Sequence, residues 1–219
     1  RELSTEQHGV LESAFNAILE ENLSQPRVYV HRDYHSRNLM VSTPNPGILD
    51  FQDAVHGPIT YDIASLMRDA FVSWEEEVVL DVSVRYWERA RQSGLLDFED
   101  WHSDFGAFYR AVEWMGLQRH LKVAGIFARL TLRDGKPKYL ADAPRFIRYI
   151  RATASRYREL APLLRLIDRS RAPSRSRRSR SGAAERRRLP EPICRASFAL
   201  TRCAQAMQSA CQAALHAMC

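Results

Sequence analysis

The stretch "VYVHRDYHSRNLMV", residues 28–41, places charged and amide side chains between two short apolar runs. Asp33 and Asn38 lie within it, and Asp50 ends the later apolar run "GILD". Carboxylate and amide oxygens are ligands that Mg²⁺ accepts, and a carboxylate can also take a proton from an acceptor hydroxyl. The pattern therefore predicts phosphoryl transfer, with Asp33 as the base and with Asn38 and Asp50 as magnesium ligands.

The neutral side chain of Asn38 supports this interpretation. Three carboxylates around phosphate oxygens would repel the substrate, whereas an amide oxygen binds Mg²⁺ without adding charge. The order His31-Arg32-Asp33, four residues and Asn38 is the H-R-D-x-x-x-x-N spacing of a kinase catalytic loop. The alternative is that these side chains only satisfy backbone groups of a turn. The complete set with Asp50 favours the catalytic interpretation.

The sequence predicts one helix before this loop and short strands around it. Ser4 and Gln7 have capping-box spacing and predict a helix over residues 5–22. The runs "RVYVH", "NLMVS" and "GILDF" predict three short strands joined by tight loops. The loop is therefore expected to rest on strand ends.

From Ile59 onward the apolar spacing becomes helical, with Pro58 as a start signal. Similar stripes predict helices at about 75–93, 98–121 and 140–160, and "KVAGIFARLTL" predicts a further helix that ends near "RDGKPK". The predicted fold class is α+β, mostly helical, with a few short strands that carry the catalytic loop.

These motifs resemble the aminoglycoside phosphotransferase and choline kinase superfamily rather than the eukaryotic protein kinases. Tyr34 and His35 follow Asp33 in place of Leu-Lys, "DFQ" replaces D-F-G, and no A-P-E follows. The stretches "VHRDYHSRNLMV", "GILDFQDAVHGPITYDIASLMRD" and "WMGLQRHLKVAGIFARL" are similar to the bacterial anomeric N-acetylmuramate/N-acetylglucosamine kinases of cell-wall recycling. The similarity covers about residues 5–168.

The resemblance implies the carboxy-terminal lobe of a protein-kinase-like fold that uses ATP and Mg²⁺ to phosphorylate the anomeric hydroxyl of an amino sugar. It implies that Asp33 is the base and that Asn38 and Asp50 hold Mg²⁺. It also implies that Asp62 braces the catalytic loop from the next helix, and that His31 packs and hydrogen-bonds behind the loop. The complete protein is expected to be a monomer.

Substrate-binding residues are harder to identify. His35 and Arg37 lie near the expected position of phosphate or acceptor. Further candidates lie on the later helical stripes, where aromatic residues usually build core and polar residues usually form a solvated face. These candidates are the aromatic residues Trp74, Tyr109 and Trp114, and the polar residues Glu113, Gln118, Arg119 and His120.

Two parts of such a kinase are not found in the sequence, namely a glycine-rich loop over the phosphates and the lysine that pairs with them. The nine glycines never give G-x-G-x-x-G, and Gly135-Lys136 lacks the earlier glycine of a Walker loop. About 25 residues precede the strand of the catalytic loop. We therefore expect residues 1–168 to be the large lobe of an incomplete kinase, without its amino-terminal lobe, and it stays open whether this chain is active or inactive on its own.

The composition changes after Asp168. Residues 169–219 hold eleven arginines and two glutamates, so this tail carries +9 of charge and residues 1–168 carry −3, giving the net +6. The Arg/Ser-rich run predicts a disordered linker over 169–192. Residues 193–219, which hold all four cysteines, predict a weak helix or an out-of-frame extension, and the cysteine spacing does not match a structural zinc site.

Two alternatives for the function stay open. The first is a kinase of the same superfamily that acts on an aminoglycoside, choline or homoserine. The second is a non-catalytic protein that binds nucleic acid through its basic tail, although the arginine run has few aromatic residues. No run of 18 apolar residues and no signal peptide is found, so we expect a cytoplasmic location and no membrane partner.

Overall fold

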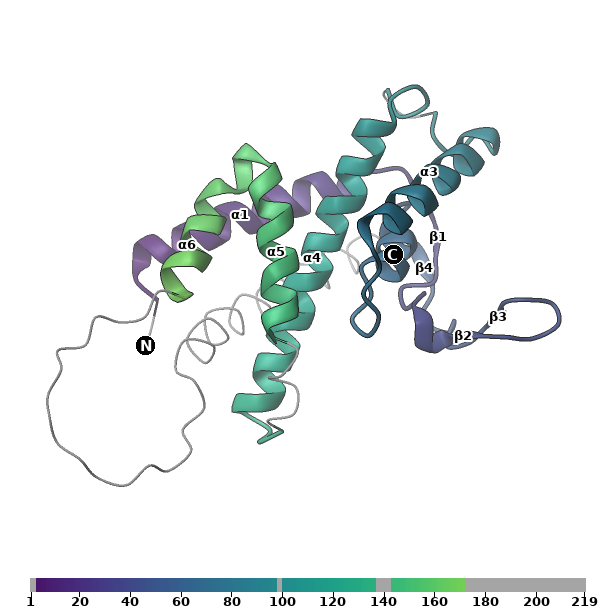
Figure 1. The fold of residues 1–219 in the computed structure, drawn as a ribbon. Coiled ribbons are helices and arrows are strands. Elements are labelled where there is room, and N and C mark those ends of the chain that lie inside the picture. Colours follow the sequence, from purple (N-terminus) through teal and green to yellow (C-terminus); the bar gives the residue numbers. More distant parts are fainter. Residues whose placement is uncertain (1–2, 98–99, 137–142, 172–219) are drawn as a thin grey trace, which may run out of the picture. The chain divides into compact units, whose positions relative to one another are not determined.

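The computed structural model describes residues 3–97, 100–136 and 143–171 (Figure 1). These residues fall into two compact units. One unit comprises residues 16–120, and the other comprises the residues up to 15 together with those from 121 onward. The predicted extension over 193–219, and the predicted linker from residue 172, lie outside the described residues.

The elements confirm the predicted α+β class, with many helices and few short antiparallel strands. In chain order they are α1 (Thr5–Leu23), β1 (Arg27–Val30), the 3₁₀ helix η1 (Ser36–Asn38), β2 (Leu39–Met40), β3 (Gly47–Ile48), β4 (Val55–Pro58), α2 (Tyr61–Met67), α3 (Glu76–Gln92), α4 (Phe105–Leu132), α5 (Ala143–Arg156), η3 (Arg158–Leu160) and α6 (Ala161–Arg171).

Helix α1 begins at the predicted capping box. The Ser4 amide donates to Gln7 Oε1 at 2.9 Å, and the Gln7 amide donates to Ser4 Oγ at 3.3 Å. Two amides that the first turn would leave unsatisfied are thus paired by side chains. The helix ends at Leu23, one residue beyond the prediction.

The strands form two antiparallel ribbons, β1 with β4 and β2 with β3. The three predicted strands are present as β1, β2 and β3, but the fourth strand, β4, was not predicted. Pro58, taken in the sequence as a helix start, is instead the last residue of β4. Gly57 pairs with Val28 in the register, and a Cβ added at Gly57 would lie 2.7 Å from Val30 Cγ2. The absence of a side chain at Gly57 therefore lets the two strands approach closely enough to pair.

The core of the 16–120 unit is built where α2, α3 and α4 meet the end of β4. Phe108 of α4 is fully buried and packs against Tyr86 and Trp101, with ring centroids 6.0 and 5.7 Å away. The buried apolar side chains of this cluster are Ile59, Ile63, Met67, Val79, Ala90, Leu96, Trp101, Phe108, Ala111 and Val112. This core holds helix α2, which carries Asp62.

Helix α4 is one continuous helix, so the predicted division into helices at 98–121 and 122–132 is wrong. Its start is set by Asp104, whose Oδ1 accepts the amides of Gly106 at 2.7 Å and Ala107 at 3.2 Å. An aspartate that accepts amides of the first turn is a typical N-cap. The residues before it, 100–103, form turns.

The middle of α4 is buried on every side, from residue 111 to residue 120. The alternative that these polar residues form a solvated face is therefore wrong. Glu113, Gln118, Arg119 and His120 are all less than 10% exposed. A helix that carries polar groups in such surroundings has to place them against other polar groups.

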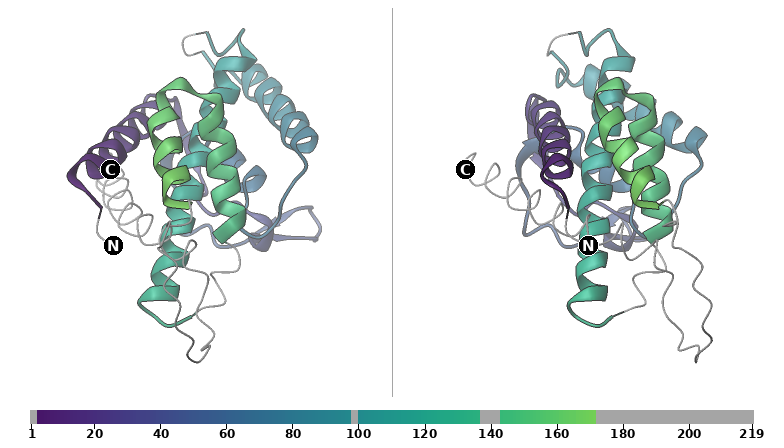
Figure 2. Two further views of the ribbon diagram at one scale, coloured as in Figure 1. Left: turned by 60° about the vertical axis from the view of Figure 1, so that its left-hand side comes forward. Right: turned by 90° about the vertical axis from the view of Figure 1, so that its left-hand side faces the viewer.

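In the other unit, α5 and α6 lie side by side (Figures 1 and 2). Phe146, Ile150 and Leu163 are fully buried there, and Arg151 Nε pairs with Asp168 Oδ1 at 2.6 Å. Helix α5 is shorter than the predicted 140–160, and α6 was not predicted as a separate helix. Residues 169–171 belong to α6 rather than to the predicted linker. Among the described residues, we find no helix with the length and apolar character needed to cross a membrane.

Candidate active site

The predicted catalytic residues lie in the loops that connect β1, η1 and the β2–β3 ribbon, within the 16–120 unit. Asn38 ends η1, and its Nδ2 donates to the backbone oxygen of Asp33 at 3.0 Å. The same nitrogen lies 3.4 Å from Asp50 Oδ2, and the Leu49 amide donates to the Asn38 carbonyl at 2.9 Å. The structure thus brings together the three positions that the sequence spacing singled out.

This arrangement fits a magnesium ion. Because Asn38 uses Nδ2 toward Asp33 and Asp50, its Oδ1 remains as an acceptor. Asp50 is exposed, and its Oδ1 accepts Gln52 Nε2 at 2.5 Å. Mg²⁺ is usually held by one or two protein ligands plus phosphates and waters. In the described part of the chain, no group of three or more His, Cys, Asp or Glu side chains suited to a metal is found.

Two residues of the site adopt a left-handed backbone that side chains other than glycine seldom take. Arg32 has φ 75° and Asp50 has φ 64°. Such a conformation costs about 1–3 kcal/mol and persists where surrounding contacts enforce it, often at functional sites. Arg32 Nη1 also donates to the Asp53 carbonyl at 3.2 Å, which links the two loops.

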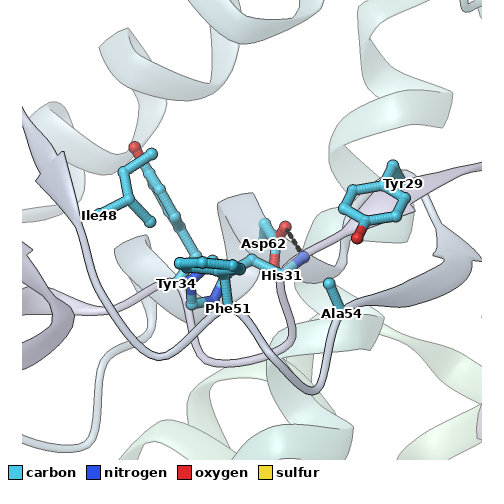
Figure 3. A pocket seen from close by; sticks show the side chains of 7 residues that line it. All are labelled: Tyr29, His31, Tyr34, Ile48, Phe51, Ala54 and Asp62. Atoms are coloured by element: carbon cyan, nitrogen blue, oxygen red, sulfur yellow. Dashed lines mark hydrogen bonds between the residues drawn. The ribbon is translucent and has the colours of Figure 1, made fainter.

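Asp62, near the start of α2, accepts hydrogen bonds from the backbone of the predicted catalytic loop. Its Oδ2 accepts the His31 amide at 2.6 Å (Figure 3). Its Oδ1 accepts the Arg32 amide at 3.0 Å. Burial raises the pKa of Asp62, and the two amide bonds and the nearby charges of His31 and Arg119 oppose that rise. One carboxylate thereby fixes two successive peptide groups just before Asp33.

Arg119 holds the same loop from α4. Its Nη1 donates to the Arg32 carbonyl at 3.4 Å, and its guanidinium lies 5.9 Å from the centre of the Tyr61 ring. Only 7% of the residue is exposed, so its contact is with the loop backbone rather than with an open substrate site. The left-handed Arg32 is therefore held through both its amide and its carbonyl group.

Asp69 is a further residue of the site that the sequence analysis missed. It is 1% exposed, and its Oδ2 accepts both the amide and the hydroxyl of Ser36, at 3.1 and 2.6 Å. Its Oδ1 accepts the Phe71 amide at 2.9 Å. An aspartate directly after a helical stripe is a turn signal that could have drawn attention to it. The carboxylate ties η1 to the loop that follows α2.

His31 lies behind the catalytic loop, where its Nε2 is 2.9 Å from the Leu49 carbonyl. Because a carbonyl only accepts, Nε2 carries the proton in this contact. A pocket of about 390 Å³ opens beside it (Figure 3). The pocket is lined mainly by aromatic and aliphatic side chains, namely Tyr29, His31, Tyr34, Ile48, Phe51, Ala54 and Asp62.

The substrate-binding candidates differ in their exposure to solvent. Arg37 is exposed, and its Cζ lies 3.5 Å from the centre of the Phe71 ring, which His35 approaches edge-on at 5.5 Å. Trp114 is 1% exposed and lies under Arg110, so its ring is not open to a sugar.

Two other aromatic candidates make polar contacts with neighbouring elements. The Tyr109 hydroxyl donates to Glu76 Oε1 at 2.9 Å. Trp74 Nε1 donates to the Leu66 carbonyl at 2.9 Å. Both contacts hold the segment between α2 and α3, and they give these rings a role in packing.

Comparison with known proteins confirms the resemblance drawn from the motifs. Residues 1–96 match the phosphotransferase enzyme family. A curated N-acetylmuramate/N-acetylglucosamine kinase of Neisseria meningitidis is 56% identical over 167 residues, covering 76% of this chain and 49% of the relative. The kinase of the same name from Pseudomonas putida is 54% identical, covering 73% of this chain and 46% of the relative. The chain therefore spans about half the length of these curated relatives.

Proposed function

We propose, from the match of residues 1–96 to the phosphotransferase enzyme family, that this chain transfers phosphate from ATP to the anomeric hydroxyl of an amino sugar. The proposed acceptors are N-acetylmuramate and N-acetylglucosamine, the two sugars that appear in the names of the relatives. The observation that carries the proposal is the position of Asn38, whose side chain reaches the Asp33 backbone and the Asp50 carboxylate at once.

In the proposed mechanism, Asp33 accepts the proton of the sugar hydroxyl as that hydroxyl attacks the terminal phosphate of ATP, and the bond from this phosphate to the bridging oxygen breaks to release ADP. Asn38 Oδ1 and the Asp50 carboxylate would hold Mg²⁺, which when bound neutralises charge on the phosphates. The hydrogen bond from Asn38 Nδ2 keeps the Asp33 backbone in place. Positioning to within a fraction of an ångström contributes strongly to such a reaction, because the protein itself does little covalent chemistry in it.

Asp62 and Asp69 act in this proposal as positioning residues rather than catalytic ones. Asp62 fixes the amides that precede Asp33, and Asp69 fixes Ser36 between Asp33 and Asn38. The catalytic loop is thus held on both sides of the base by buried or half-buried carboxylates. Removal of either carboxylate is expected to lower turnover more than substrate affinity.

We further propose that residues 1–168 form the large lobe of a kinase and that the reaction takes place in the cytoplasm, where ATP is available. The monomeric state expected of the complete protein is part of the same proposal. The alternative of nucleic-acid binding depends on residues 169–219, of which only 169–171 are described, and there they continue helix α6. No contact among the described residues favours that alternative.

The proposal is tested by incubating the 219-residue chain with ATP and Mg²⁺ and following sugar 1-phosphate by ³¹P NMR. We expect product from N-acetylmuramate and N-acetylglucosamine, and none after Mg²⁺ is chelated. Kanamycin, choline and homoserine serve as competing acceptors. Transfer to one of these and not to the amino sugars would replace the proposed acceptor, and no transfer at all would refute the activity for this chain.

A further inference from the structure

We infer that Arg37, stacked on Phe71, binds a carboxylate of the acceptor and thereby distinguishes N-acetylmuramate from N-acetylglucosamine. The two sugars differ in the lactyl ether of N-acetylmuramate, which ends in a carboxylate. The inference rests on the proposed function and deepens it by naming the residue that recognises this group.

The short helix η1 directs three consecutive side chains toward three different partners. A 3₁₀ helix has three residues per turn, so successive side chains are about 120° apart. Ser36 Oγ meets Asp69, Arg37 meets the Phe71 ring, and Asn38 Nδ2 meets Asp50. Arg37 therefore lies next to the proposed metal ligand Asn38 in sequence, but its side chain extends toward a different partner.

The Arg37–Phe71 pair is held in place from behind. The buried Asp69 accepts the Ser36 amide with one carboxylate oxygen and the Phe71 amide with the other. The backbones that carry the guanidinium and the ring are thereby fixed relative to each other. His35 packs on the same ring at 5.5 Å. Because the Arg37 and Phe71 side chains are already ordered, a ligand that binds here loses less conformational entropy in ordering them, and this favours affinity.

The guanidinium is also prepared for an anion. Its Cζ is 3.5 Å from the ring centre, so one face rests on Phe71 while the N–H groups at its edge remain available for a bidentate contact. Arg37 has no carboxylate partner within 4.0 Å among the residues that the structure describes. Other arginines in this part of the chain do have one, as Arg68 with Glu76 and Arg110 with Glu21 show.

The surroundings favour a sugar acid over a phosphate as the ligand. Phe71 is 41% exposed, so part of its ring remains open next to the guanidinium. An open aromatic ring suits the C–H face of a sugar or the lactyl methyl group, neither of which a phosphate offers. The nucleotide phosphates have their own proposed ligands through Mg²⁺ at Asn38 and Asp50.

The test measures the affinity of the 219-residue chain for each sugar by ligand-observed NMR titration. Arg37→Gln should weaken N-acetylmuramate binding by about tenfold or more, as expected for the loss of a charge-assisted contact. The affinity for N-acetylglucosamine should change by less than about twofold. Arg91→Gln is the matched control, because Arg91 stacks on Trp87 at 4.7 Å in α3, and it should change neither affinity.

Other results of this titration would contradict either the role of Arg37 or the proposed function itself. An unchanged affinity for N-acetylmuramate, or an equal loss for both sugars, would overturn the assignment of Arg37. A loss confined to the affinity for Mg²⁺-ATP would also overturn it and would place a phosphate at Arg37. If the unmodified chain bound neither sugar, the proposed function would fail together with the inference.

Discussion

At the scale of single residues, the peptide groups of His31 and Arg32 are held by side chains from two different helices. Asp62 accepts both amides, Arg119 donates to the Arg32 carbonyl, and Arg32 itself has φ 75°. The left-handed conformation is unfavourable on its own, so these contacts must offset it. Asp33, the proposed base, follows directly, and the direction of its side chain depends on this constrained peptide.

Asp62 gives the first prediction, which concerns pH. Because burial raises its pKa above the ordinary 3.8, the folded chain retains a proton that the unfolded chain has released. The contribution of Asp62 to the free energy of unfolding is therefore greatest below pH 3.8 and decreases as the pH rises through the raised pKa. The difference in unfolding free energy between the unmodified chain and Asp62→Asn should decrease across that window.

This difference is measured by urea unfolding at a series of pH values. A difference that stays constant, or that increases with pH, would contradict the raised pKa. Activity should follow the opposite trend, because a protonated Asp62 can accept only one of the two amide hydrogen bonds with full strength. Phosphate transfer should therefore decline as the pH falls through the same window.

At the scale of elements, Asp69 links η1 to the loop that follows α2. Its removal leaves the Ser36 amide and hydroxyl and the Phe71 amide without their acceptor. We expect Asp69→Ala to lower the free energy of unfolding by about 2–3 kcal/mol. Asp81→Ala is the control, because Asp81 pairs only with the exposed Arg85, and its loss should cost less than about 1 kcal/mol. Equal urea midpoints for both variants would contradict the link.

Helix α4 gives a second prediction at this scale, through Gly116. A Cβ at Gly116 would lie 2.9 Å from Arg68 Cγ, and Arg68 is held by two hydrogen bonds to Glu76. Gly116→Ala should therefore destabilise the chain by about 1–3 kcal/mol. Gly9→Ala in α1 meets no atom within 4 Å and should instead stabilise it by about 0.4–1 kcal/mol. Thermal unfolding distinguishes the two cases, and stabilisation by both variants would show that Arg68 can move.

At the scale of the whole molecule, the sequence predicted what depends on local spacing. The capping box at Ser4 and the set Asp33, Asn38 and Asp50 are visible in short windows, and the structure brings the latter three positions together. The class of fold followed from the change of apolar period.

Other features depend on contacts between segments that are distant in the chain, so no short stretch of sequence reveals them. Strand β4 was missed because Pro58 reads as the start of a helix, although Gly57 packs against Val30. Asp69 and Arg119 act on residues 33 and 87 positions away in the chain. Their burial could not be deduced from their own neighbours in sequence, which are also polar or mixed.

The central claim is that Asp33 is the base of a phosphotransferase whose metal ligands are Asn38 and Asp50. The most direct test compares the rate of N-acetylmuramate 1-phosphate formation by the unmodified chain and by Asp33→Asn, with Mg²⁺-ATP affinity measured in parallel. The account predicts a loss of about 10²–10⁴-fold in rate with nucleotide affinity essentially unchanged. A variant that still transfers phosphate at the original rate would contradict it.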